Sequence, residues 1–501
     1  MNGTNFLLNR DKQFKKSIIT DSLQILALYL FTALVIYKLP RITGYILFTS
    51  IILQFYKSKK DYFWLAFLFV ICTGPGGFFY ATQEVMIGQL PVFGLGGGIN
   101  VSIIEVFLAA AILKVLTKGK KQQIPLSKPL LMIMFYSLFM FVISIVVFDT
   151  TLIRFLKDLR YFSYYFFIIP LSYLVYKEGD VEKLVYCIFP FVFVSFFAAI
   201  YYIFKEDYLV NLFAPGLMEQ MKLGIEEGGA RYGTSAMGGH LMLLLCYMSS
   251  LFLSFKEAGL KRRNIYLLLI AGISYFTMML TGTRIWFVVF SFIFIMSVIF
   301  IKKNLKMLGG VLLIAALLYI PYKYISKIHD FSNKAWTRIE SVFEMDKKGS
   351  VGYKALEHKK KRRWSRSLAG IKKSPWIGLG VSDQFRENSG GADAGNLSLI
   401  VQVGIIGFLL FANSWMKFFL MVSNVNKKLS PGNPYRSILF FFSISLLGIL
   451  IAHFTTHQVF AMVTSKSDSI FLMLFLFLSG YFVKDAMREE YFLQRSAEKE
   501  K

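Results

Sequence analysis

Charged residues are scarce in this sequence of 501 residues: Asp, Glu, Lys and Arg make up 17% of it, whereas hydrophobic residues make up 55%. This composition excludes one ordinary soluble domain and indicates an integral membrane protein. The apolar runs are close to the roughly 20 residues that a helix needs to cross a bilayer, and they lack the alternation typical of outer-membrane strands. We therefore predict an all-α fold.

Cysteine is also rare. The three cysteines, Cys72, Cys187 and Cys246, lie inside apolar runs, which predicts neither a disulfide framework nor a thiolate metal cage. No small-residue cleavage site follows the first apolar run, 22–37, so we interpret it as a retained span and not as a signal peptide. The sequence also has no cluster of metal-ligating residues, and we expect neither a metal nor another cofactor.

The predicted fold is a polytopic membrane helix bundle of about fourteen transmembrane helices. The candidate spans are approximately 20–37, 42–57, 61–80, 99–117, 129–148, 153–176, 183–204, 236–254, 264–281, 284–301, 306–322, 396–420, 437–455 and 468–484. Placing the N-terminus in the cytoplasm sends every lysine-rich connection inside, as the positive-inside rule requires. Those connections are 57–60, 118–128, 256–263, 302–306 and 426–436. We expect a multi-pass protein of the cytoplasmic (inner) membrane with both termini in the cytoplasm.

The other connections are then extracytoplasmic. They are 81–98, 148–152, 205–235, 281–283, 323–395 and 456–467. The predicted organisation is N-terminal helices in 1–150, central helices in 151–322, a long extracytoplasmic loop with short helices in 323–395, C-terminal helices in 396–484 and a cytoplasmic tail in 485–501.

The net charge of +26 would suggest nucleic acid as the partner of a soluble protein. Here the topology signal and anionic lipid of the inner leaflet explain most of it, and we expect no nucleic acid. The loop 323–395 is different, because it carries sixteen Lys and Arg against eight Asp and Glu on the outer side. Its basic residues, among them Arg363, Arg366 and Lys372, form either a solvated face or a rim that contacts an anionic ligand such as a lipid pyrophosphate.

Three arginines lie in unusual contexts on the predicted outer side. In "LIRFLKDLRYFSYYFF", Arg160 falls on a span at helical spacing from Arg154. An arginine near the bilayer centre costs about 2.5–3.5 kcal/mol, so a partner or cavity is expected for Arg160. The alternative is that the side chain extends to the headgroups, which suits Arg154 better.

Arg231 and Arg284 each stand immediately before or at the start of an apolar run. "GGARYGTSAMGGHLMLLL" leads from Arg231 into a span, and a helix N-terminus with a small-residue approach favours anions. "LTGTRIWFVVF" holds Arg284 at a tight outer turn, where its guanidinium can bind two phosphate oxygens. A plain loop with a helix cap and an interfacial anchor are the respective alternatives. His240 is interpreted as a core histidine and not as a base.

The fourth segment joins the long loop to the span at 396–420. Its "SPWIGLG" predicts a helix stop and a turn that returns the chain to the membrane, followed by Asp393 among glycines. Asp393 is a candidate general base for a sugar hydroxyl, with the glycines leaving room for sugars. The alternative is that Asp393 only caps the following helix.

These motifs resemble, in their order, the O-antigen ligase and polymerase superfamily of bacterial membrane glycosyltransferases. The resemblance rests on "RYGTSAMGGHLMLL", "LTGTRIWFVVF", Trp364 with Pro375, Gly378 and Gly380, and "D-x-G-N-L-x-L-x-V-Q-V-G-I-I-G". It covers about residues 150 to 460. It implies a GT-C-like helix bundle, donor and acceptor glycans on undecaprenyl pyrophosphate, and outer arginines that hold the pyrophosphate. Those roles fall on Arg231 and Arg284, and on Arg160.

One departure separates the chain from ligases of that family, which typically carry His-Asn where this sequence has Asp393-Ala394. A carboxylate at that place resembles polymerase-like members, so polymerisation of lipid-linked repeat units at an extracytoplasmic active site is the favoured function. The arginines would stabilise the diphosphate leaving group. The resemblance implies membrane lipid, a chain-length regulator and a flippase as partners. Ligation of the lipid-linked glycan to lipid A-core or another acceptor is the first alternative.

A polysaccharide or lipid transporter is the second alternative. It predicts broken spans at matched positions in the two halves of the chain and charged residues at mid-depth. The glycine-rich segment 71–78 would be one such break, and no corresponding interruption is evident in the second half. The charged motifs also gather at one face, which favours surface chemistry.

Overall fold

The computed structural model describes most of the chain. The described residues are 3–79, 92–94, 100–118, 128–153, 156, 162–175, 179–205, 207–212, 239–256, 262–281, 284–300, 323–340, 353, 357, 359–388, 395–430, 433, 435–455 and 466–499.

Helices make up nearly all of the described elements, which confirms the predicted helical class. They are α1 Gly3–Lys38, α2 Arg41–Lys57, α3 Asp61–Thr73, η1 Pro75–Gly77, α4 Ile103–Lys118, α5 Lys128–Val146, η2 Tyr164–Phe167, α7 Ile168–Leu174, α8 Asp180–Ile188, α9 Pro190–Lys205, η3 Leu209–Leu212, α11 Gly239–Lys256, α12 Arg262–Leu280, α13 Arg284–Phe300, α15 Ser326–Glu340, η4 Lys359–Trp364, α17 Ser365–Lys373, α18 Asp383–Asn388, α19 Asn396–Lys428, α20 Tyr435–Thr455 and α21 Lys466–Lys499.

A short β-hairpin departs from the all-α prediction. Strands β1 (Val92–Gly94) and β2 (Asn100–Ser102) pair antiparallel, with Phe93 opposite Val101. The hairpin delays the start of the next helix, so α4 begins at Ile103 instead of the predicted 99. Glu105 accepts a hydrogen bond from the backbone N–H of Ser102 (2.7 Å), which satisfies a donor at the start of α4.

Two predicted spans are shorter or more broken than expected. The span predicted at 61–80 is wrong at its end: α3 stops at Thr73, because Gly74 adopts a left-handed conformation (φ 55°) and Pro75 follows. The chain continues as the 3₁₀ turn η1. The span predicted at 183–204 is divided into α8 and α9 at Pro190, whose ring nitrogen cannot donate to the preceding turn.

Five helical segments in the described part of the chain are long and apolar enough to cross a membrane. They are Ser17–Lys38, Asp180–Lys205, Asn396–Lys428, Tyr435–His453 and Asp468–Tyr491. Shorter apolar helices accompany them, among them Asp61–Thr73, Gly239–Ser254 and Ile265–Leu280. This supports a polytopic membrane protein. The total of fourteen spans stays a prediction, and the span predicted at 306–322 lies outside the described residues.

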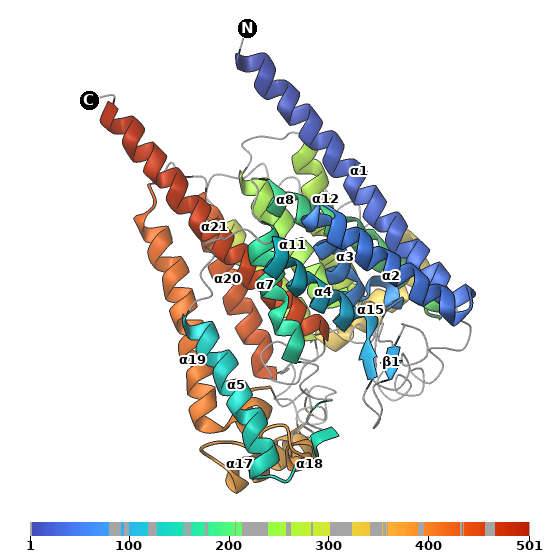
Figure 1. Cartoon of the computed structure of the whole chain (residues 1–501), viewed down its shortest axis with the longest axis vertical. Helices are drawn as coiled ribbons and strands as arrows, with labels where there is room; N and C mark the ends of the chain where they lie inside the picture. The colour runs from blue at the N-terminus through green and yellow to red at the C-terminus, as the bar shows by residue number, and fades with distance from the viewer. Residues whose placement is uncertain are drawn as a thin grey trace.

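The helices form a bundle around α3, α11 and α21. Leu65 to Ile71 of α3 are each 0% exposed, as expected for a helix that is apolar on every side. Figure 1 shows the first turns of α1 and the last turns of α21 at one end of the molecule, and α17 and α18 at the other. The predicted topology requires this grouping, with the termini on one side and the long loop on the opposite side.

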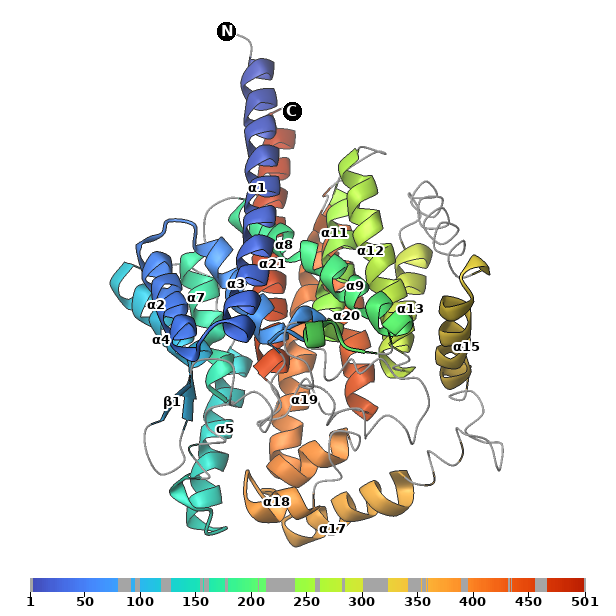
Figure 2. The ribbon, with the colours of Figure 1, turned by 90° about the vertical axis from the view of Figure 1, so that its right-hand side faces the viewer.

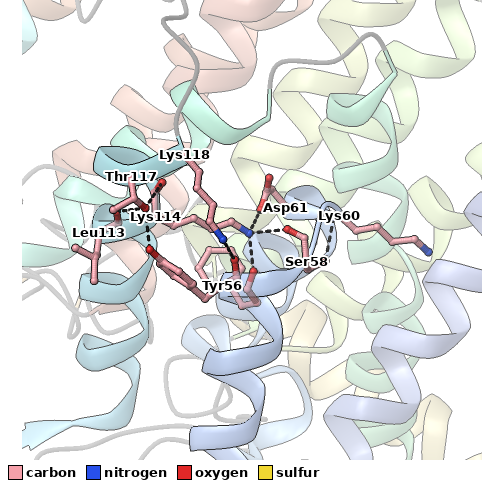
Figure 3. A network of polar contacts seen from close by, with 9 residues as sticks. Tyr56, Ser58, Lys60, Asp61, Leu113, Lys114, Thr117 and Lys118 are labelled. Atoms are coloured by element: carbon pink, nitrogen blue, oxygen red, sulfur yellow. Dashed lines mark hydrogen bonds and ion pairs between the residues drawn. The ribbon is translucent and has the colours of Figure 1, made fainter.

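A polar network joins α2, α3 and α4 beside the α2–α3 turn (Figure 3). The ammonium of Lys114, a residue only 2% exposed, donates to Asp61 (2.5 Å) and to the backbone oxygens of Phe55 (2.5 Å) and Ser58 (2.8 Å). All three of its N–H donors therefore have acceptors. Nearby, Asp21 of α1 accepts from Lys60 and Tyr62, both at 2.7 Å. These contacts tie α1 and α4 to the start of α3.

Candidate functional site

The four residues expected to carry the chemistry fall largely outside what the structure describes. Arg160, Arg231 and Asp393 lie outside the described residues, and Arg284 is the first residue of α13. Their proposed roles stay predictions. The neighbouring elements are described, and they indicate which of the predicted motifs come together.

Helix α11, which comes after Arg231 in the chain, and helix α13, which begins at Arg284, meet at their first turns. The ring of His240, the second residue of α11, lies 5.2 Å from the ring of Trp286, the third residue of α13. Both residues are buried, His240 at 6% and Trp286 at 1% exposure. The beginnings of α11 and α13 are thus adjacent, as a shared anion site at two helix N-termini would require.

The "SPWIGLG" turn docks on a break in α19. Gly404 interrupts this helix with φ 67° and ψ −179°. Around the break, the N–H groups of Leu379 and Gly380 donate to the carbonyls of Val401 (2.7 Å) and Gln402 (2.8 Å). In return, the N–H groups of Ile405 and Ile406 donate to Pro375 (2.8 Å) and Trp376 (3.2 Å). The turn thus takes up the backbone groups that the break leaves without helical partners.

Three glycines allow this close approach. A Cβ on Gly378 would lie 2.3 Å from the backbone nitrogen of Gly404, and one on Gly404 would lie 2.2 Å from the carbonyl oxygen of Trp376. A Cβ on Gly380 would lie 2.0 Å from Oγ of Ser144. All three have positive φ, at 83°, 67° and 64° for Gly378, Gly404 and Gly380. Glycine is needed at each position for both space and conformation.

Helix α5 supports the docked turn from the other side. The hydroxyl of Tyr136 donates to the carbonyl oxygen of Val403 (2.7 Å), beside the break. Ser144 accepts from the N–H of Val381 (2.9 Å) and donates to Met140 (2.7 Å). No local sequence signal marks Tyr136 and Ser144, because their partners lie 267 and 237 positions away.

A small apolar core lies under the docked turn. It consists of Met140, Phe141, Phe162, Val381, Leu399, Val403 and Phe411. Phe162 is two residues after Arg160, and Leu399 is six residues after Asp393. The segments that follow these two predicted site residues therefore pack against each other and against the turn, although they are far apart in the chain.

The break in α19 departs from the single continuous span predicted at 396–420. The available signal was a glycine within an apolar helical run, "VQVGIIG", which marks a close approach of backbone or a kink. The break at Gly404 is also an interruption in the second half of the chain, where none is predicted from the sequence. The "SPWIGLG" segment itself is a turn that follows α17, as predicted.

The basic loop residues lie on η4 and α17. Arg363 is partly buried, whereas Arg366 and Lys372 are exposed. Lys361 forms an exposed i,i+4 ion pair with Glu357 at 2.8 Å, and its hydrogen bond and charge lower the pKa of the Glu357 carboxyl. Exposure suits both a solvated face and an anion-binding rim, so contacts of Arg363, Arg366 and Lys372 with a ligand stay predictions.

The helices and the docked loop define the class first: a polytopic helical membrane protein with a structured loop beside a broken helix. The family comparison then adds a more particular similarity. Residues 265–412 match the O-antigen ligase family model, which confirms the predicted resemblance to the O-antigen ligase and polymerase superfamily. The match runs from α12 into α19 and includes Arg284, the docked turn and Asp393. No curated protein gives a significant match.

This similarity indicates a ligase- or polymerase-type function, glycosyltransferase-like and directed at lipid-linked glycans. The matched region contains the docked turn, the broken helix and the beginning of α13. Helices α5 and α11, which contact these elements, lie outside the matched residues.

Proposed function

We propose that the protein polymerises undecaprenyl-pyrophosphate-linked oligosaccharide repeat units into a surface polysaccharide at the outer face of the cytoplasmic membrane. The observation that carries the proposal is the docking of the "SPWIGLG" turn on the α19 break within the family-matched region. This docking holds the beginning of α19 against α5, directly after Asp393 in the chain. A rigid helix start is what a catalytic group needs for defined positioning.

The reaction is a transfer of a glycan between two lipid-linked chains. A hydroxyl oxygen of the acceptor sugar attacks the anomeric carbon of the donor, a new glycosidic bond forms, and the bond from that carbon to the diphosphate breaks. Undecaprenyl diphosphate leaves with the bonding electron pair. Asp393 takes the proton of the hydroxyl, and Arg231, Arg284 and Arg160 stabilise the charge that grows on the diphosphate.

Asp393 favours a polymerase over a ligase, because ligases of the family typically have a histidine where this chain has Asp393. The family model that matches is described as O-antigen ligase, which keeps ligation as the second candidate. The two differ in the acceptor: a polymerase extends another lipid-linked glycan, whereas a ligase transfers the finished chain to a final acceptor. A chain-length regulator and a flippase of the same pathway are the expected partners of the polymerase.

Transport is less well supported. The interruptions at η1 and at Gly404 give one break in each half of the chain, a feature that a transporter would also have. At Gly404, however, the backbone groups of the break bond to the protein's own turn, and the residues of η1 are buried. The hydrogen bonds at Gly404 and the burial of η1 favour a structural role for both breaks.

The test is a gel profile of surface and lipid-linked glycans in a strain that lacks the gene. We expect acceptors with a single repeat unit after deletion and long chains after restoration of the wild type. Arg284→Ala and Asp393→Asn should each fail to restore the long chains. The control, Lys59→Ala, changes an exposed lysine in the turn between α2 and α3 and should restore them. Long chains that remain on the lipid carrier with a bare final acceptor would identify a ligase, and an unchanged profile would contradict both.

A further inference from the structure

Helix α15 of the long loop packs against the bundle close to Arg284. It contacts α9, α12 and α13, and Figure 2 shows it alongside α13. Ile328 anchors it in the main core at 3% exposure, and the ammonium of Lys327 donates to the carbonyl oxygen of Phe204 at the end of α9 (3.3 Å). The helix is therefore a fixed part of the bundle and not a free segment of the loop.

Trp336 and Glu340 form an exposed pair on α15. The indole N–H of Trp336 donates to Oε1 of Glu340 at 2.5 Å. The Trp336 ring also packs edge-to-face on Phe287, with centroids 5.8 Å apart and an interplanar angle of 89°. Two neighbours thus orient the indole, yet Trp336 remains 43% exposed. A pre-oriented aromatic ring with an accessible surface is a typical ligand contact.

The pair lies next to the predicted diphosphate site. Phe287 follows Arg284 by three residues, so the two share one face of α13 and are separated by about 4.5 Å along its axis. Trp336 therefore contacts α13 one turn from the residue expected to bind the diphosphate. A ligand held through its diphosphate at Arg284 would have its first sugars within reach of the Trp336 ring.

We propose that Trp336 and Glu340 form a sugar-binding subsite for the donor glycan, which rests on the function proposed above. A sugar ring presents C–H groups on its face and hydroxyls at its edge. The indole offers an apolar surface for the face, and the Glu340 carboxylate accepts hydrogen bonds from the hydroxyls. Trp336 positions that carboxylate through the 2.5 Å hydrogen bond.

An interfacial membrane anchor is the competing role for an exposed tryptophan. Glu340 argues against it, because a carboxylate bonded to the indole repels the phosphate of a lipid headgroup and suits neutral hydroxyls instead. Tyr324, which is 75% exposed and precedes α15, has the ammonium of Lys323 5.5 Å from its ring centroid, and is the better candidate for an anchor. It provides the control.

The experiment measures binding of two probes to the purified, detergent-solubilised protein. One probe is undecaprenyl pyrophosphate without sugars, and the other is the glycan-bearing lipid that accumulates in the deletion strain. We expect Trp336→Ala to lower the affinity for the glycan-bearing lipid about tenfold and to leave the affinity for the sugar-free lipid unchanged. Glu340→Gln should act in the same direction, and Trp336→Phe, which keeps an aromatic face, should fall between Trp336→Ala and wild type.

Two further variants, Arg284→Ala and Tyr324→Ala, distinguish a failure of the proposed subsite from a failure of the proposed function. The arginine variant should lose affinity for both probes, and the tyrosine variant should keep both. Equal affinities of Trp336→Ala and wild type for the glycan-bearing lipid would refute the subsite while the arginine result upholds the proposed function. If Trp336→Ala binds neither lipid, the subsite is also refuted, because the substitution then disturbs the structure in general. Failure of the wild type to bind either lipid would overturn the proposed function together with the subsite.

Discussion

Lys114 shows how strongly a single buried cation depends on its partners. Lys114→Met keeps the length and apolar stem of the side chain but leaves Asp61 and two backbone carbonyls without their donor. Breaking such a buried pair costs about 3–5 kcal/mol. We expect a clear fall in the thermal unfolding midpoint of the purified protein.

Lys118, one turn further along α4, is the matched control. It is exposed and donates to the backbone oxygen of Tyr56 at 2.9 Å. Lys118→Met should change stability by no more than about 1 kcal/mol, since exposed contacts are screened by water. Equal shifts for the two variants would show that burial of Lys114 contributes nothing.

The hydroxyl of Ser144 connects two segments that are distant in sequence. It accepts from the N–H of Val381, and both residues are buried. Ser144→Ala leaves that N–H without an acceptor, at a cost of about 1–3 kcal/mol. Ser365→Ala, which removes only an exposed hydroxyl, should be close to neutral. The thermal unfolding midpoints of the two variants measure this difference in stability. An unchanged midpoint for Ser144→Ala would show that the hydrogen bond to Val381 does not stabilise the protein.

At the scale of the element, the break in α19 depends on glycine. Gly404→Ala forces a Cβ against the carbonyl of Trp376 and imposes a positive φ on alanine, which costs of order 1–3 kcal/mol in strain before the clash is counted. We expect the turn to leave the break and glycan synthesis to fall with it. Gly448→Ala is the control, because a Cβ there would meet side-chain atoms and no backbone, with Cγ1 of Val289 nearest at 3.1 Å. Full polymer synthesis in Gly404→Ala would show that the docked turn is dispensable.

Helices such as α2 and α13 could be predicted from sequence because their signals are local. The predicted spans 42–57 and 284–301 agree with Arg41–Lys57 and Arg284–Phe300 within a residue at each end. The break at Gly404 could not be predicted in the same way, since a turn more than twenty residues earlier provides its hydrogen bonds. The pairing of Trp336 with Phe287 is equally non-local. Motif order predicted the family, whereas only the fold indicates which motifs are neighbours.

At the scale of the whole molecule, different elements lie at the two ends of the bundle. The first turns of α1 and the last turns of α21 lie at one end, with the α2–α3 turn on the same side of the bundle, and α17 and α18 lie at the other end (Figures 1 and 2). The positive-inside rule assigns the first end to the cytoplasm. All three native cysteines are buried, so a cysteine introduced at the surface can report its side of the membrane.

Lys59→Cys and Ala369→Cys place such reporters at the two ends, on exposed positions of the α2–α3 turn and of α17. In intact spheroplasts, a membrane-impermeant maleimide should label Ala369→Cys and spare Lys59→Cys, and both should react once the membrane is opened. The reverse pattern would invert the predicted topology. It would also place the docked turn, Trp336 and the proposed diphosphate site on the cytoplasmic side, where polymerisation at the outer face could not use them.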